Sequence, residues 1–145
     1  MEPFVRLFIR SSLVWLGVGV SIGLWMVLDP GAVGYRPAHM HANLLGFVSM
    51  MIFGVAYHVL PRFCGAPLRS RPAANAHVVL ANAGLAAMVG GWFVRVSVPE
   101  VGQWILAAGG LLSAVGAFLF IGNLWLTINE GTRPVALRPA SARSS

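Results

Sequence analysis

Charged residues are scarce in this 145-residue chain, and lysine is absent altogether. Charged residues make up 10% of the sequence and hydrophobic residues 57%, and the mean hydropathy is +0.77. A soluble domain of this size needs a charged, mixed surface, which ten basic and four acidic residues cannot supply. The composition therefore predicts an integral membrane protein with one membrane domain.

Other absences narrow the chemistry. The single cysteine, Cys64, excludes an internal disulfide and is interpreted as a bystander in a loop. No acidic residue lies inside an apolar run, so the sequence shows no carboxylate proton relay. There is no glycine-rich phosphate loop or zincin motif, and no serine is marked as a nucleophile by a neighbouring base and acid. These reaction classes are therefore disfavoured.

Four apolar runs predict an all-α bundle of four transmembrane helices, at about residues 4–28, 37–60, 73–98 and 103–128. Turns are expected at 29–31, where Asp-Pro-Gly stops the first helix, and at 99–102. Residues 1–130 would form the membrane domain. The tail at 131–145 is rich in proline, alanine, arginine and serine and is predicted to be disordered.

The ten basic residues are all arginines, and their placement predicts the orientation. With four spans, both termini and the middle loop share one side, which holds eight arginines, whereas only Arg36 and Arg95 lie on the other. By the positive-inside rule both termini are cytoplasmic, in the inner (plasma) membrane of a bacterium. This rule explains the arginines better than nucleic-acid binding does, so no nucleic-acid partner is expected.

Small residues predict close helix packing in two spans. Gly19 and Gly23 form a small-xxx-small pattern in the first span. One face of the fourth span is predicted to be smooth. Its small residues are Gly109, Gly110, Ser113, Gly116 and Ala117.

His39 and His41 open the second span, about one turn after Arg36. An intramembrane histidine is by default a functional-site hypothesis. A spacing of two residues is about 200° on an α-helix, so the rings should point to nearly opposite sides and serve two different sites. A guanidinium beside two imidazoles suits a ligand with a metal centre and carboxylates, which describes haem. The alternative is a polar helix end that is hydrogen-bonded to a neighbour.

The other two histidines lie at the opposite end of the spans. His58 follows His41 by 17 positions, about 25 Å along a helix, so they cannot share a site within one subunit. Because the spans alternate in direction, His77 shares the end of His58, and these two could meet. Both are interpreted first as interfacial rings without a site role.

The stretch from Arg36 to Arg62 resembles a helix of the catalytic subunit of haem-copper oxidases, closest to the C-type oxidase and nitric oxide reductase branch. The resemblance rests on AHMHANLLGF at 38–47 and GVAYHVLPR at 54–62 and covers about a fifth of the chain. It implies that His39 corresponds to the ligand of the high-spin haem and His41 to that of the low-spin haem. The Arg-Pro-x-His pattern at 36–39 also resembles the start of the helix that supplies the other low-spin ligand.

By this resemblance, Arg36, His39 and His41 would bind haem b, with Arg36 pairing a propionate and the site facing the periplasm. Further histidines for the family's copper site are not seen, so copper is not expected, nor is oxygen reduction by this chain alone. The family subunit is three four-helix arcs, and this chain is one arc long. A cyclic homo-oligomer, most simply a trimer, would place haem between His41 of one protomer and His39 of the next. A twofold dimer with facing His41 rings is the main alternative.

The expected function is that of a membrane b-type haem protein that transfers electrons with a respiratory-chain partner or handles NO or O₂. If it is an enzyme, it would be an oxidoreductase. Two histidine ligands would suit electron transfer, and one would leave a position open for the gas. The alternative is a non-catalytic membrane subunit or assembly partner of a respiratory oxidase complex. A small transporter is less favoured because the polar residues cluster at helix ends.

Overall fold

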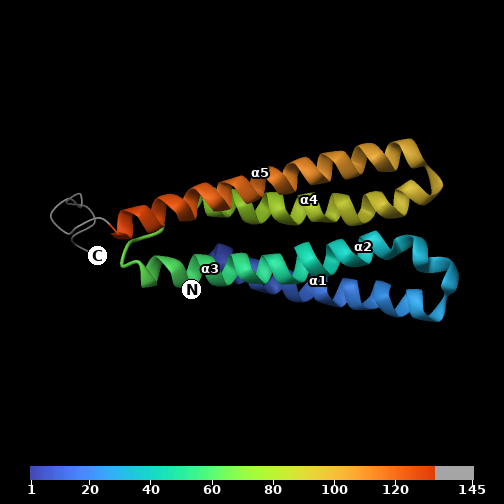
Figure 1. Ribbon diagram of the computed structural model, residues 1–145, viewed down its shortest axis with the longest axis horizontal. Helices are drawn as coiled ribbons and strands as arrows, with labels where there is room; N and C mark the ends of the chain where they lie inside the picture. The colour runs from blue at the N-terminus through green and yellow to red at the C-terminus, as the bar shows by residue number, and fades with distance from the viewer. Residues whose placement is uncertain (133–145) are drawn as a thin grey trace.

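The computed structural model describes residues 1–132, which form four helical rods and contain no strand (Figure 1). The elements are α1 Pro3–Leu28, the 3₁₀ helix η1 Pro30–Tyr35, α2 Arg36–His41, the π-helix η2 Ala42–Ser49, α3 Met50–Phe63, α4 Arg71–Ser97 and α5 Pro99–Thr132. The second rod runs from η1 to α3. All four rods are long and apolar enough to cross a membrane. The predicted all-α membrane fold is confirmed.

The four rods form two hairpins (Figure 1). The first hairpin pairs α1 with the second rod, and the second pairs α4 with α5. One end of the bundle, called the terminal end below, holds the start of α1, the end of α3, the start of α4 and the end of α5. Large apolar side chains cover the outside, among them Val27, Trp104 and Phe118, which are 80%, 77% and 71% exposed. Such side chains suit contact with lipid.

Several boundaries differ from the prediction. The turn expected at 99–102 is instead the first turn of α5, and only Val98 separates α5 from α4. Pro99 starts that helix because the first helical position needs no N–H donor. At the other end, α5 continues to Thr132, so the first two residues of the predicted tail are helical. The predicted disorder of residues 133–145 lies outside the described residues. The turn at Asp29 is confirmed, with Oδ1 accepting from the backbone N–H of Gly31 at 2.9 Å.

Glycines allow α4 and α5 to pack backbone against backbone. A Cβ on Gly109 would lie 2.7 Å from the carbonyl oxygen of Gly84 and 2.8 Å from the backbone nitrogen of Met88. Gly102, Gly109 and Gly116 are buried at seven-residue spacing, which keeps one face of α5 on its partner. The predicted smooth face is confirmed at Gly109 and Gly116, whereas a Cβ on Gly110 would meet nothing within 4 Å.

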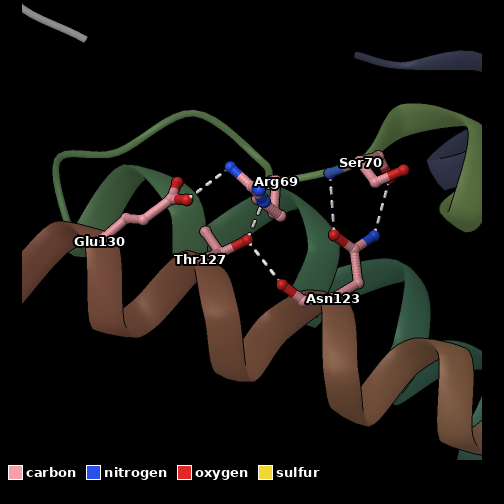
Figure 2. A network of polar contacts seen from close by, with 5 residues as sticks. All are labelled: Arg69, Ser70, Asn123, Thr127 and Glu130. Atoms are coloured by element: carbon pink, nitrogen blue, oxygen red, sulfur yellow. Dashed lines mark hydrogen bonds and ion pairs between the residues drawn. The ribbon is translucent and has the colours of Figure 1, made fainter. Parts of the chain in front are cut away.

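The loop between the two hairpins is tied to α5 by side-chain hydrogen bonds (Figure 2). The Asn123 amide donates to the carbonyl oxygen of Ser70 at 2.7 Å and accepts from its N–H at 2.9 Å. The Thr127 hydroxyl accepts from the N–H of Arg69 at 3.0 Å and donates to the carbonyl oxygen of Asn123 at 2.8 Å. Arg69 also pairs with Glu130 at 2.9 Å. The loop therefore depends on buried groups of α5 more than on its exposed ion pair.

We expect Asn123→Leu to destabilise this connection. The variant leaves the N–H and carbonyl of Ser70 without the amide that pairs with both, at a cost of about 1–3 kcal/mol. Thermal unfolding in detergent measures the effect. Asn129→Leu is the matched control because Asn129 lies on the same helix and is exposed. Equal melting temperatures for the two variants would contradict the structural role given to Asn123.

Candidate functional site

His41 is the last residue of α2 and lies beside an open groove. Its Nδ1 is 2.6 Å from the carbonyl oxygen of Pro37. Because a carbonyl can only accept, Nδ1 carries the proton and Nε2 keeps its lone pair. A backbone carbonyl that holds the far nitrogen of the ring is the arrangement found for metal-ligating histidines. His41 therefore presents the tautomer that an iron ligand needs.

The groove at His41 has a volume of about 250 Å³ and is lined by Met40, His41, Leu44 and Leu45. All four residues come from one stretch of the second rod, and Leu44 is 55% exposed. A site for a large cofactor normally encloses most of the ligand surface. This groove supplies only one wall of such a site.

His39 points in a different direction, into its own bundle. Its Nδ1 donates to the carbonyl oxygen of Gly19 on α1 at 2.8 Å. The ring lies against Gly23, where a Cβ would come within 2.8 Å of the ring carbon Cε1. The predicted small-xxx-small pattern is thus the surface that receives this histidine. The rings of His39 and His41 therefore point in different directions, as predicted. The alternative interpretation from the sequence, a polar helix end that is hydrogen-bonded to a neighbouring helix, applies to His39.

Asn43 completes the packing of His39 against α1. Its amide donates to the carbonyl oxygen of His39 at 2.9 Å, and its side chain covers Gly19, where an added Cβ would lie 2.5 Å from Nδ2. The sequence reasoning missed this residue. The available signal was a polar residue four positions after His39, because residues at that spacing are neighbours on a helix.

The π-helix η2 follows His41 directly, over Ala42–Ser49. The Ser49 hydroxyl donates to the carbonyl oxygen of Leu44, five residues earlier, at 2.9 Å. Gly46 lies against Trp15 of α1, with an added Cβ 2.5 Å from the Cβ of Trp15. π-helical turns are rare and occur frequently at functional sites, so η2 is a second observation that marks this segment.

Arg36 is the first residue of α2 and is exposed. Within residues 1–132 it forms no ion pair with a carboxylate. It precedes Met40 by four residues, so the two side chains are neighbours on the helix surface. Arg36 therefore lies on the side of the helix where Met40 lines the groove.

The terminal end brings His77 together with Tyr57. The Tyr57 hydroxyl lies 3.2 Å from Nδ1 of His77, and both residues are buried. The ring of His77 packs against Phe8, Phe53 and Phe120 at centroid distances of 4.8, 4.7 and 5.5 Å. His77 is thus a buried core residue. The prediction that its ring lies at the membrane interface was wrong. The partner of His58 is Arg62, which donates to its Nδ1 at 2.9 Å.

A second polar contact joins the two hairpins near mid-span. The indole N–H of Trp15 donates to the Asn82 side-chain oxygen at 3.3 Å, and the Asn82 amide donates to Ser11 at 3.3 Å. A cavity of about 70 Å³ also lies between the hairpins, lined by His77, Leu45, Ser113 and other side chains of both. Its small size suits packing, not a cofactor.

Within the described part of the chain, no group of three or more His, Cys, Asp or Glu residues could hold a metal ion. A haem iron takes only one or two axial ligands from protein, so the donor set at His41 fits haem better than a free metal ion. Comparison with known protein families found none that matches, and a search of curated proteins found no match either.

Proposed function

We propose that the chain is a membrane b-type haem protein in which Nε2 of His41 is an axial ligand. The observation that supports this proposal is the geometry of the His41 ring. Its Nδ1–H donates to the carbonyl of Pro37, and the ring lines an open groove. A bound haem would supply a redox centre and, with one axial position open, a binding position for NO or O₂.

The residues around His41 have separable tasks in this proposal. The carbonyl of Pro37 fixes the tautomer and orientation of the ring. Met40, Leu44 and Leu45 give the groove an apolar lining. Arg36 supplies a guanidinium that pairs with a propionate, because a planar guanidinium matches a carboxylate. Met40 and Leu44 are exposed on the outside of the bundle, whereas Leu45 also lines the small cavity between the hairpins.

A second subunit is needed because the groove has only one wall. In the trimer predicted from the sequence, His39 of the neighbour would be the second ligand. His39 would then have to leave the carbonyl of Gly19 and its place on Gly23. A twofold dimer with two facing His41 rings needs no such change, and its interface uses the same surface on both subunits. The hydrogen bond and packing that His39 already makes inside its own bundle therefore favour the dimer.

The orientation proposed for the protein places this groove towards the periplasm. The start of α1 with Arg6, the end of α3 with Arg62 and the start of α4 with Arg71 lie at the terminal end, and α2, which begins at Arg36, starts near the other end. The positive-inside rule then places the terminal end in the cytoplasm of a bacterial cell. Electron transfer with a respiratory-chain partner would take place at the periplasmic end.

The alternative function is that of a non-catalytic membrane subunit or assembly partner of a respiratory oxidase complex. Gly110 and Gly122 of α5 favour it, because a Cβ on either would meet nothing within 4 Å. Outward-facing glycines allow a helix of another protein to approach closely.

A spectrum of the purified protein separates the two functions. After haem-replete expression, the dithionite-reduced protein is expected to show sharp low-spin haem bands if two histidines hold the iron. Assembly mass in detergent and haem content then identify the oligomer. One haem per two protomers supports the dimer, and one per protomer in a trimer supports the ring. A colourless protein would rule out the haem function and leave the subunit function.

A further inference from the structure

The terminal end contains a cavity larger than the groove at His41. Its volume is about 390 Å³, within the range of small-ligand sites. The start of α1, the end of α3, the loop between the hairpins and the start of α4 form its walls. Its polar lining residues are Glu2, Tyr57, His58, Arg62 and Arg71.

Hydrogen-bond donors outnumber acceptors in this cavity. Arg62 donates to Nδ1 of His58 at 2.9 Å and to its carbonyl oxygen. A guanidinium can only donate, so Nδ1 of His58 is an acceptor and the ring proton is on Nε2. His58 is thus a further N–H donor beside two guanidiniums.

Among residues 1–132, one carboxylate opposes these donors. Glu2 pairs with Arg71 at 3.1 Å, and the two side chains are 42% and 71% exposed. Exposed pairs of this kind contribute little stability, so an anion that binds Arg71 more tightly than Glu2 does can replace the Glu2 carboxylate. The cavity carries an excess of positive charge.

The cavity lies where the rods end. Glu2 precedes α1, Arg62 is in the last turn of α3, and Arg71 starts α4. The ends of membrane-spanning helices lie at the level of the lipid headgroups. The remaining wall is largely apolar, with Phe4 and Leu68 among its residues. An amphiphile with an anionic head and a hydrocarbon tail matches both parts.

We propose that this cavity binds the phosphate of an anionic phospholipid from the leaflet at the terminal end. Guanidinium groups match phosphate oxygens, and basic pockets between membrane helices recognise such headgroups. A quinone that exchanges electrons with His41-bound iron is disfavoured because His58 is about 25 Å from His41 along the second rod. The lipid site does not depend on the haem site.

The test is a titration of the full-length protein in detergent, with binding measured by native mass spectrometry. The probes are dioctanoyl-phosphatidylglycerol, dioctanoyl-phosphatidylcholine and inorganic phosphate. We expect the anionic lipid to bind at least ten times more tightly than the zwitterionic lipid, whose choline would lie among the arginines. Inorganic phosphate should bind weakly because it makes no apolar contact. Equal binding of the two lipids, or saturation by phosphate alone, would overturn the proposal.

Two variants of one ion pair give opposite expectations. Arg71→Gln removes a phosphate donor and should weaken binding of the anionic lipid about tenfold. Glu2→Gln removes the competing carboxylate and should tighten binding two- to threefold. Each variant breaks only an exposed pair, so folding should survive. Changes in the same direction for both variants would contradict the site.

Arg6→Gln is the matched control for surface charge. Arg6 is exposed at the same end of the bundle but does not line the cavity. Its loss should change affinity less than twofold. A loss equal to that of Arg71→Gln would mean diffuse attraction in place of a site, and displacement of the lipid by decylubiquinone would assign the cavity to a quinone.

Discussion

His41→Ala is expected to abolish the low-spin haem bands and to lower haem content at least tenfold, without loss of the fold. Within residues 1–132, the one hydrogen bond of the His41 side chain is to Pro37 of the same helix, and the ring lines an outer groove. Removing it would therefore cost the proposed haem ligand and very little packing. Reduced-minus-oxidised spectra and haem content per protein, taken with melting temperatures, check both halves of the expectation.

Two comparisons make this result specific to a ligand. His58→Ala removes a histidine at the far end of the same rod and should leave the spectrum unchanged. His41→Gly with added imidazole should regain the bands, because a free imidazole can occupy the vacated volume. Retention of wild-type bands by His41→Ala would refute the ligand assignment.

His39→Ala separates the two ligation schemes. If His39 ligates iron, its loss should leave haem bound but convert the spectrum from low-spin to high-spin. If it only packs against Gly19 and Gly23, the band positions should persist while the melting temperature falls. The packing observed for His39 favours the second outcome.

Gly109→Val should produce a large loss of stability. Its side chain would start against the backbone of Gly84 and Met88, and neither backbone can move without separating α4 from α5. Overpacking typically costs about 1–3 kcal/mol and occasionally more, and a loss of about 3 kcal/mol lowers the melting temperature on the order of 10 °C for a chain of this size. Thermal unfolding and gel filtration in detergent measure the effect.

The neighbouring glycine provides the control. Gly110→Val adds the same atoms one residue later, where a Cβ meets nothing within 4 Å. We expect the melting temperature of this variant to change by no more than a few degrees. If both variants melt alike, then α4 and α5 do not pack through Gly109.

Hydrophobic run length was sufficient to predict the four rods, because each must be long and apolar to cross a bilayer. The opposed rings of His39 and His41 also followed from helix geometry alone. The inward position of His39 did not, since it depends on Gly19 and Gly23 of another helix. No residue pattern along one helix shows which face its neighbour will cover.

The terminal end was harder to predict for the same reason. The pairing of His77 with Tyr57, and not with His58, is set by how three rods come together. The extra helical turn at Pro99 was missed because Pro-Glu-Val-Gly is compatible both with a turn and with a helix start. The π-helix had no recognised signal in the sequence, although Gly46, which lies within it, packs against Trp15 of α1.

The π-helix fixes the rotational phase between the two ends of the second rod. His41 faces the groove just before η2, and Tyr57 reaches His77 just after it. A π-helical turn closes five residues on, where an α-helical turn closes four residues on, so Ala42–Ser49 holds about one residue more than α-helical turns would need for the same rotation. Deleting one residue from this segment could therefore restore α-helical turns and still leave Tyr57 facing His77. The segment can change its length by one residue without changing the directions of the side chains on either side of it.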